Sequence, residues 1–387
     1  MPTKIVNQGK QPATARRKLV CDWAGSAVKS ESTLHQLSPY IGKIKSSMAA
    51  SLVSQFTNEG DLIYDPFSGS GTVALEAWAA KRPVVANDLS PYAYLLTRAK
   101  LFPSRSLEDA LDQIDRASVE AVKLRGDIDL RRVPRWVRRF FHPETLRETL
   151  AWVHVLRQRR SWFLLASLLG ILHHQRPGFL SFPSSHTVPY LRVKKFPRSR
   201  FPELYAYRSV RDRLEAKVTR AFRRMPELDY SIARSCFCRD AGGLVPPESV
   251  EAIITSPPYM RLLDYARDNR LRLWFLGAHD WHSLDGIVSP RQDDFLKLMA
   301  RCFVKWKTVL KPDHCCVLVI GDAFGEIAKG NLPDVVSRIA TEEVGGYVRV
   351  CEYTETIPNE RRVRRGIMGS ASETIVVLRN TGTRRFQ

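Results

Sequence analysis

The stretch that most constrains the fold is residues 61–100, "DLIYDPFSGSGTVALEAWAAKRPVVANDLSPYAYLLTRAK". An apolar run ends in a Gly-rich turn and is followed by a helical pattern, a second apolar run, an acidic turn and a second helical pattern. This alternation predicts a βαβ unit and therefore a parallel sheet. We expect an α/β protein.

The same rhythm returns after residue 230. We expect strands within 230–241, 250–259 and 314–324, two more in "GYVRVCEYTETI" and "SETIVVLRN", a helix near 292–310 and an earlier helical pattern from His35 to Phe56. Residues 101–229 break the rhythm, being mostly helical in pattern with a proline-punctuated stretch at 176–202. We therefore expect a flexible basic N-terminus at 1–30, one catalytic domain formed by 31–100 and 230–387, and an insertion at 101–229.

The charge is concentrated in that insertion. The chain has 60 Lys and Arg against 40 Asp and Glu, a net charge of +20, and the insertion alone has 26 against 14, a net charge of +12. Such a surplus indicates a polyanionic partner, although a basic solvated surface without a function is the alternative. We expect the insertion to be a target-recognition region. Basic residues of the insertion beside aromatic ones are candidate nucleic-acid contacts: Arg135, Arg138, Arg139, Lys194 and Lys195. Arg361 and Arg362, in the C-terminal "NERRVRRG", are a further candidate clamp on the nucleic-acid backbone.

Several classes of protein are disfavoured by what the sequence lacks. The seven cysteines show no CxxC pair, which favours reduced thiols over disulfides or a zinc site, and no metal is expected. The sequence has no signal-peptide pattern and no uncharged apolar stretch of 18 residues. We expect a cytoplasmic protein of a bacterium or archaeon without a membrane partner.

The turn "DPFSGSGT", residues 65–72, ends a strand and opens a helix. Gly69 and Gly71 would let the backbone approach a ligand that the N–H groups of the helix face. A P-loop would need a Lys after Gly71, and a dinucleotide fingerprint would need Gly where Ala74 stands. A tight turn with no ligand is the alternative interpretation.

Asp88 ends the second strand, in "VVANDLSP". An acid at that place can accept hydrogen bonds from two ribose hydroxyls, although it could also cap the next helix. Together with the Gly turn it indicates a cofactor that carries a nucleoside but whose phosphates, if any, are not gripped. S-adenosylmethionine fits that description.

The strand "VEAIITS" leads into "TSPPY", residues 255–259. Proline cannot donate to a sheet, so this motif ends the strand and exposes rigid carbonyls beside the Ser256 hydroxyl. These acceptors suit an exocyclic amine of a nucleobase, with Tyr259 stacked on the base, and the amine is reachable only in a flipped or single-stranded base. A Pro-Pro turn that merely caps the strand is the alternative.

"DPFSGSGT" together with "TSPPY" resembles the amino-methyltransferases of DNA, which transfer a methyl group from S-adenosylmethionine to an exocyclic base nitrogen. The resemblance covers roughly 35–100 and 230–380. Ser256 is most similar to the N4-cytosine enzymes, since N6-adenine enzymes usually carry Asp or Asn there. In many N4-cytosine enzymes the proline motif precedes the glycine motif, whereas here it follows.

The resemblance implies a class I methyltransferase fold, a Rossmann-like, mostly parallel seven-stranded sheet, here with a basic and mainly helical insertion. It also implies that "HQLSPYIGKIKS" (35–46) is a helical segment that closes over the cofactor. The implied cofactor-binding residues are Tyr40, Gly42, Asp65, Phe67, Gly69, Gly71, Thr72, Asp88 and Asp240. The implied catalytic residues are Ser256, Pro257, Pro258 and Tyr259. Asp264 and Tyr265, which follow, could line the same pocket.

We therefore expect a site-specific DNA methyltransferase that acts on N4 of cytosine in double-stranded DNA by base flipping. Its expected context is a restriction-modification system, with a cognate endonuclease acting on the same site but not bound in a stable complex. Three alternatives stay open: an N6-adenine DNA methyltransferase, an RNA amino-methyltransferase and a catalytically silent DNA-binding protein.

Overall fold

The computed structural model describes residues 19–21, 23, 31–174, 178–185, 188–258, 264–321, 331–356 and 372–382. Within them lies a seven-stranded sheet with the strand order β3-β2-β1-β4-β5-β7-β6. The strands are β1 (Ile63–Asp65), β2 (Val84–Asn87), β3 (Arg234–Phe237), β4 (Val250–Thr255), β5 (Leu310–Gly321), β6 (Tyr347–Thr356) and β7 (Ser372–Asn380). The first five pair in parallel, while β7 runs antiparallel between β5 and β6. The predicted class I methyltransferase fold is confirmed.

Some predicted features cannot be placed on this sheet. Tyr259, Arg361 and Arg362 lie outside the described residues, as does most of the segment 1–30. No helix among the described residues combines the length and the apolar composition needed to cross a membrane.

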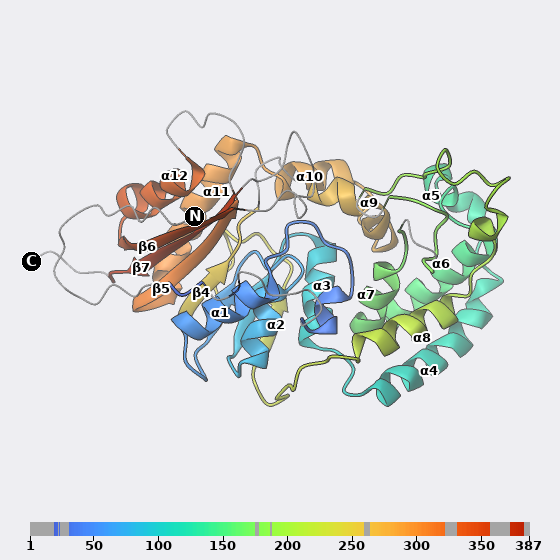
Figure 1. Cartoon of the computed structure of the whole chain (residues 1–387), viewed down its shortest axis with the longest axis horizontal. Coiled ribbons are helices and arrows are strands. Elements are labelled where there is room, and N and C mark those ends of the chain that lie inside the picture. Colours follow the sequence, from blue (N-terminus) through green and yellow to red (C-terminus); the bar gives the residue numbers. More distant parts are fainter. Residues whose placement is uncertain are drawn as a thin grey trace, which may run out of the picture.

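Helices cover both faces of the sheet (Figure 1), as expected for parallel strands that are buried on both sides. On one face, Tyr64 and Ile253 pack into a core with α11 (Gln292–Val309) and α12 (Leu332–Arg338), which η4 (Ile339–Val344) extends. On the other face, Ile63 and Ile254 join a second core. The helices of that core next to the sheet are α1 (Ser46–Phe56), α2 (Thr72–Ala79) and α3 (Pro91–Leu101).

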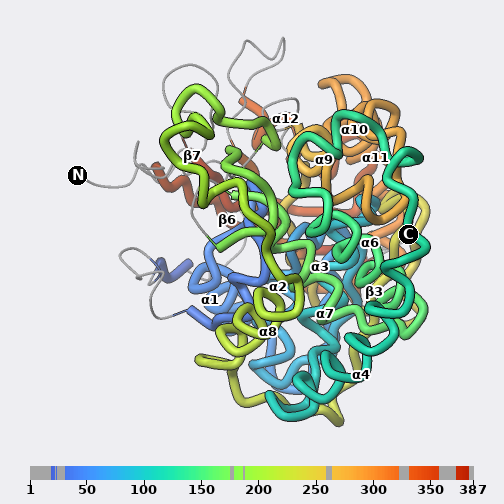
Figure 2. The backbone as a smooth tube through the Cα atoms, turned by 90° about the vertical axis from the view of Figure 1, so that its right-hand side faces the viewer, coloured from blue at the N-terminus to red at the C-terminus, as the bar shows by residue number. Residues whose placement is uncertain are grey.

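The insertion is helical, as its pattern predicts, but it has no core of its own. Its Trp152 and Leu164 belong to the same buried cluster as Met48 of α1 and Val73 of α2. Figures 1 and 2 show its helices stacked at one end of the molecule, beyond α3. They are α4 (Leu107–Arg125), η2 (Leu130–Arg132), α5 (Arg135–Arg138), α6 (Pro143–Gln158), α7 (Trp162–Gly170), η3 (Pro202–Tyr205) and α8 (Val210–Ala221).

Two further helices connect the sheet region to the insertion. Helix α9 (Tyr265–Phe275) runs above α3 towards α5, and α10 (Trp281–Val288) lies beside it (Figure 1). The Phe275 ring meets Phe141 of the insertion edge to face, with centroids 6.0 Å apart. Arg272 Nε donates to the Leu169 carbonyl over 3.2 Å. The end of α9 is therefore fixed on the insertion.

One predicted element differs in the structure. The helical pattern from His35 is interrupted, because only η1 (Thr33–Gln36) forms before α1 begins at Ser46. Pro39 disfavours helical geometry at the residue before it, and Gly42 adopts a left-handed φ of 75°. The segment 37–45 is thus irregular, and the expectation of a helix there was wrong.

A close contact between α7 and this irregular segment provides a test of the packing. A Cβ at Gly170 would collide with the Leu37 carbonyl oxygen, a backbone atom that cannot rotate away. We expect Gly170→Ala to lower the free energy of unfolding by roughly 2 kcal/mol, a typical cost of overpacking. Denaturant-induced unfolding followed by circular dichroism measures it.

Gly126 is the matched control, because it has helical φ and ψ angles and open space where a Cβ would be added. Gly126→Ala should be neutral or stabilising by about 0.5 kcal/mol, through the entropy of the unfolded chain. Equal stabilities of the two variants would contradict the packing of α7 on residue 37.

Candidate active site

A cavity of about 310 Å³ lies at the carboxyl ends of β1, β2 and β4. The order of the strands reverses between β1 and β4, and ligands of open α/β sheets bind at such switch points. The predicted site residues that line the cavity are Tyr40, Gly42, Asp65, Phe67, Gly69, Thr72, Asp88, Asp240, Ser256 and Pro258. Of the described residues predicted for the site, Gly71, Pro257 and Asp264 are not part of its wall.

The two glycines of the turn have different roles. Gly69 (φ 52°) faces the cavity, and a Cβ there would come no closer than 3.5 Å to the Tyr40 ring. Gly71 (φ 71°) packs against α3, where a Cβ would lie 2.8 Å from the Cα of Thr97. Gly69 therefore leaves space for a ligand, whereas Gly71 allows α2 to approach α3.

Asp88 joins the two turns that follow β1 and β2. Its Oδ2 accepts the Gly69 N–H over 2.8 Å and its Oδ1 accepts the Ser90 N–H over 2.9 Å. Burial raises the pKa of Asp88 to about 6, although these two hydrogen bonds lower it. Each carboxylate oxygen has a second acceptor position, so Asp88 can hold the turn and accept from a ligand at once.

Asp65 ends β1 and is bonded across to β4. The Thr255 hydroxyl donates to Asp65 Oδ1 over 2.7 Å and accepts the Phe67 N–H over 3.1 Å. Burial raises the pKa of Asp65 to about 7 and the nearby Asp88 adds to this, while the Thr255 hydrogen bond lowers it. The free protein thus holds two poorly solvated carboxyls in one cavity, which is an environment that favours a cationic ligand.

Ser256, directly after β4, is held by the neighbouring strand. Its hydroxyl donates to the Val319 carbonyl of β5 over 2.8 Å. Because the single hydroxyl proton is used in this bond, Ser256 offers only acceptor lone pairs to a ligand. Pro258 lines the same cavity, while Pro257 is buried behind it.

Asp240 follows β3 at the far side of the cavity. Its Oδ2 accepts a hydrogen bond from Arg301 of α11 over 3.0 Å, and its Oδ1 accepts the Gly242 N–H over 3.2 Å. Buried Asn87 ties the strand ends together, since its amide donates to the carbonyls of Pro66 and Arg239.

Sequence patterns missed several residues of the cavity wall. Lys43 and Ile44 precede α1, Arg301 belongs to α11, and Ile287 and Pro290 lie at the junction of α10 and α11. Lys43 and Ile44 lie within the segment 35–46 that was expected to close over the cofactor, whereas Ile287, Pro290 and Arg301 belong to no motif and only the folded chain reveals them. Tyr265, which sequence analysis placed near the pocket, does line it, and its ring stacks with Tyr40 at a centroid distance of 6.3 Å.

The five predicted nucleic-acid contacts that the structure describes do not line the cavity. Arg135, Arg138 and Arg139 are exposed at α5, and Lys194 and Lys195 are exposed on the loop that follows α7. These five cations lie on the outer surface of the insertion.

Similarity to solved structures is limited. The chain is 12% identical to the rRNA methyltransferase aviRa from Streptomyces viridochromogenes, over 95% of this chain and 97% of that one, with a TM-score of 0.33. It is 8% identical to an rRNA methylase from Streptococcus thermophilus, over 87% and 97%, with a TM-score of 0.33. It is 14% identical to TrmN from Thermus thermophilus, with a TM-score of 0.32, over 87% of this chain but about half (48%) of the length of TrmN. Scores at this level carry no argument, and the fold is established by the strand order.

The comparison with curated proteins gives no match. Residues 23–98 match the family model described as DNA methylase. This stretch contains the Gly turn, Asp65 and Asp88, and the match does not separate N4 of cytosine from N6 of adenine. The predicted resemblance is confirmed by this match: over residues 23–98 the chain is similar to the DNA methylase family, the amino-methyltransferases of DNA, whose methyl donor is S-adenosylmethionine.

Proposed function

We propose that the protein methylates the exocyclic N4 of cytosine in a specific site of double-stranded DNA, on a base flipped out of the duplex. We further propose that it is the modification enzyme of a restriction-modification system, whose endonuclease acts on the same site. The observation that carries the proposal is that Gly69 and Ser256 line one cavity, at the ends of the adjacent strands β1 and β4.

The cavity fits S-adenosylmethionine in charge and chemistry. When bound, this cofactor supplies an electrophilic methyl group on a positively charged sulfonium, and it also carries an ammonium group and ribose hydroxyls. Buried Asp65 and half-buried Asp88 are carboxyls suited to such cationic and hydroxyl groups, and Gly69 leaves room beside them. Asp240 would lie on the adenine side.

The Ser256 hydroxyl suits the acceptor base. An exocyclic amine is a weak nucleophile, because its lone pair is delocalised into the ring. Since the Ser256 proton is held by Val319, the oxygen can accept an amine hydrogen and draw the nitrogen towards the tetrahedral geometry required for attack. Prearranged acceptors of this kind contribute on the order of a hundredfold or more in rate. Because Pro257 is not part of the cavity wall, the proposal gives its carbonyl no direct contact with the base. Tyr259 would stack on the base.

The course of α9 supports a proposed contact between the insertion and the flanking duplex. Tyr265, the first residue of α9, lines the cavity, and Phe275, the last, packs on Phe141 beside α5. An 11-residue helix spans about 16 Å, which is about five base pairs of B-form DNA. The proposed duplex could thus reach the arginines of α5 while one base enters the cavity. We propose residues 101–229 as the region that contacts DNA.

The methylated nucleoside tests the proposed reaction. After incubation with S-adenosylmethionine and plasmid DNA, digestion and mass analysis should give N4-methylcytosine. Ser256→Ala should reduce the rate roughly a hundredfold, because the amine loses an acceptor, and should change cofactor affinity by less than about threefold.

Ser337→Ala is the matched control, because Ser337 also donates a buried hydroxyl to a carbonyl, that of Pro333, but does not line the cavity. It should keep full activity. N6-methyladenine as the product would exclude cytosine, a labelled product on tRNA alone would indicate an RNA enzyme, and no product at all would indicate a silent binding protein.

Cofactor affinity should depend on pH. The pKa values of Asp88 and Asp65 are raised to about 6 and about 7, so both groups are protonated in free protein at low pH. Because the ionised carboxylates bind the cofactor, affinity should rise roughly tenfold or more from pH 5.5 to pH 7.5 and then level off. Isothermal titration calorimetry across this range measures it.

The free energy of unfolding of the protein without cofactor should change in the opposite direction, falling as the pH rises. For a carboxyl with a raised pKa, the stabilising contribution is complete below its unfolded value near 4 and is lost as pH rises through 6 to 7.

Asp88→Asn should weaken cofactor binding and flatten the lower part of the curve of cofactor affinity against pH. An affinity that stays constant between pH 5.5 and 7.5 in the parent protein would contradict the assignment of these carboxylates.

Charge reversal tests the DNA surface. Changing Arg135, Arg138 and Arg139 together to Glu should weaken duplex binding at least tenfold and reduce its salt dependence, because fewer counterions are released. Fluorescence anisotropy at several salt concentrations measures both quantities.

A second triple variant controls for net charge. Lys81, Lys297 and Lys305 are exposed and lie outside the insertion, so changing all three to Glu alters the total charge equally. If both triple variants bind duplex DNA with the same affinity and salt slope, the insertion is not the DNA surface.

A further inference from the structure

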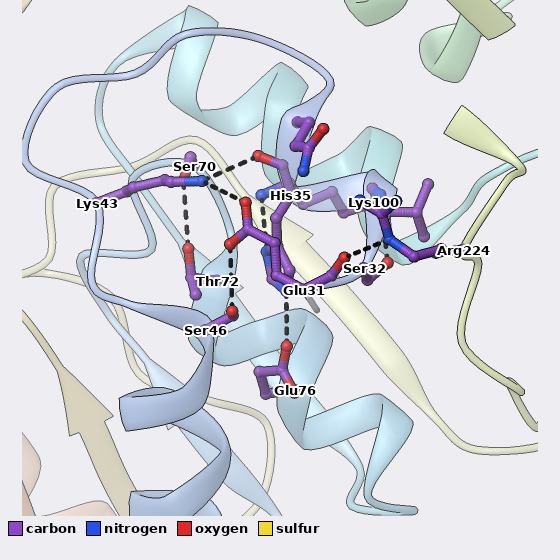
Figure 3. A network of polar contacts seen from close by, with 12 residues as sticks. Glu31, Ser32, His35, Lys43, Ser46, Ser70, Thr72, Glu76, Lys100 and Arg224 are labelled. Atoms are coloured by element: carbon purple, nitrogen blue, oxygen red, sulfur yellow. Dashed lines mark hydrogen bonds and ion pairs between the residues drawn. The ribbon is translucent and has the colours of Figure 1, made fainter. Parts of the chain in front are cut away.

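A cluster of ionisable side chains adjoins the cavity through Lys43 and takes no part in the proposed chemistry (Figure 3). It consists of Glu31, His35, Lys43, Glu76 and Lys100. The His35 side chain is fully buried, and Lys100 is 1% exposed. Buried lysines are rare and costly unless they are paired, so this arrangement requires an explanation.

The central three side chains form a chain of hydrogen bonds. Lys100 Nζ lies 3.5 Å from His35 Nδ1, and His35 Nε2 lies 2.6 Å from Glu76 Oε1. An ammonium group can only donate, so Nδ1 accepts and the ring proton is on Nε2, from which it is donated to Glu76. Burial lowers the pKa of His35, and the positive charges of Lys100 and Lys43 lower it further. A neutral imidazole thus connects an ammonium group to a carboxylate.

These three residues come from three of the segments that form the cavity. Glu76 is on α2, which follows the Gly turn, and Lys100 is on α3, which follows Asp88. His35 is on η1, which leads into the irregular segment that carries Tyr40 and other residues of the cavity wall.

Lys43 and Glu31 complete the cluster on its outer side. Lys43 Nζ lies 3.6 Å from Glu31 Oε1 and donates to the His35 carbonyl over 3.3 Å. The Ser46 hydroxyl donates to Glu31 Oε2 over 3.2 Å. Lys43 also lines the cavity, so the cluster extends to the binding surface itself.

We propose that Lys100, His35 and Glu76 are positioning residues that hold the segment 37–44 against the Gly turn in its cofactor-binding position. This inference rests on the proposed function, since it takes the cavity to be the site of S-adenosylmethionine. It assigns the three side chains no contact with the cofactor.

The physical basis is charge compensation. Removing one partner of a buried pair leaves the other charge uncompensated, whereas removing both restores neutrality. Segment 37–44 is irregular and forms one side of the cavity. If one partner were removed, displacement of this segment would let water reach and solvate the remaining unpaired charge. The cofactor would then lose part of its site. Burial already raises the pKa of Glu76 to about 7 and lowers that of Lys100 to about 7, and Lys43 and Glu31 also act on them.

The test compares the dissociation constant of S-adenosylmethionine for Lys100→Met and Glu76→Gln with that of the parent protein, between pH 6 and pH 8.5. Lys100→Met leaves a carboxylate, so its affinity loss should be roughly tenfold at pH 8.5 and should shrink as Glu76 is protonated at pH 6. Glu76→Gln leaves an ammonium group, so its loss should be roughly tenfold at pH 6 and should shrink at pH 8.5. Opposite pH trends are a signature that a merely structural role would not produce.

Two controls complete the experiment. The double variant of Lys100→Met and Glu76→Gln should bind within about threefold of the parent at every pH, because it contains no uncompensated charge. Lys311→Met removes one partner of the ion pair with Glu251. This pair lies at the amino ends of β4 and β5, away from the cavity at the carboxyl ends, so the variant should leave the affinity unchanged.

The inference would be overturned by variants that melt at a lower temperature yet bind the cofactor as the parent does. Losses of cofactor affinity that do not change with pH would also overturn the inference. A double variant that binds the cofactor as weakly as the single variants would overturn it too. If Lys100→Met does not fold, the pH trend of the cofactor affinity of Glu76→Gln tests the inference by itself, because the Glu76 side chain is 19% exposed and tolerates an amide. Parent protein that fails to bind S-adenosylmethionine would instead refute the proposed function.

Discussion

The hydrogen bond between Thr255 and Asp65 fixes the geometry on which the candidate site depends. It joins the ends of β1 and β4, where the strand order reverses, and the same hydroxyl accepts the Phe67 N–H of the Gly turn. Because Asp65 is 2% exposed, water cannot replace this bond easily. The Gly turn and the Ser-Pro-Pro edge are therefore parts of one rigid unit, and Ser256 is held from its other side by Val319 of β5.

This rigidity has an electrostatic cost. The site holds the carboxyls of Asp65 and Asp88 together in a poorly solvated place, and each raises the free energy of ionising the other. Binding sites commonly keep such unfavourable arrangements, because a ligand of opposite charge relieves them. The backbone donors at Asp88, from Gly69 and Ser90, limit the cost without removing the negative charge.

The parts of the fold that could be predicted from sequence were those set by local pattern and by strand direction. Parallel strands bring their carboxyl ends to one edge of the sheet, so the two motifs could be placed together although 188 residues separate Phe67 from Thr255. The role of Gly71 could not be predicted, because its constraint is the distance to Thr97 on another helix. Lys100 resembles a solvent-facing residue of α3 until η1 and α2 enclose it. Packing between distant segments, rather than local preference, determines such residues.

The distribution of charge separates two kinds of binding within one chain. The insertion carries a net charge of +12, whereas the cavity presents Asp65, Asp88 and Asp240. Without screening, the electrostatic fields of the basic insertion and of the acidic cavity would offset each other. At physiological salt, however, charges are screened over about 8 Å. The α5 arginines lie about 16 Å away along α9, beyond that length. The basic surface can thus attract a phosphate backbone while the acidic cavity attracts a cation and repels phosphate, so each binding surface keeps its own preference.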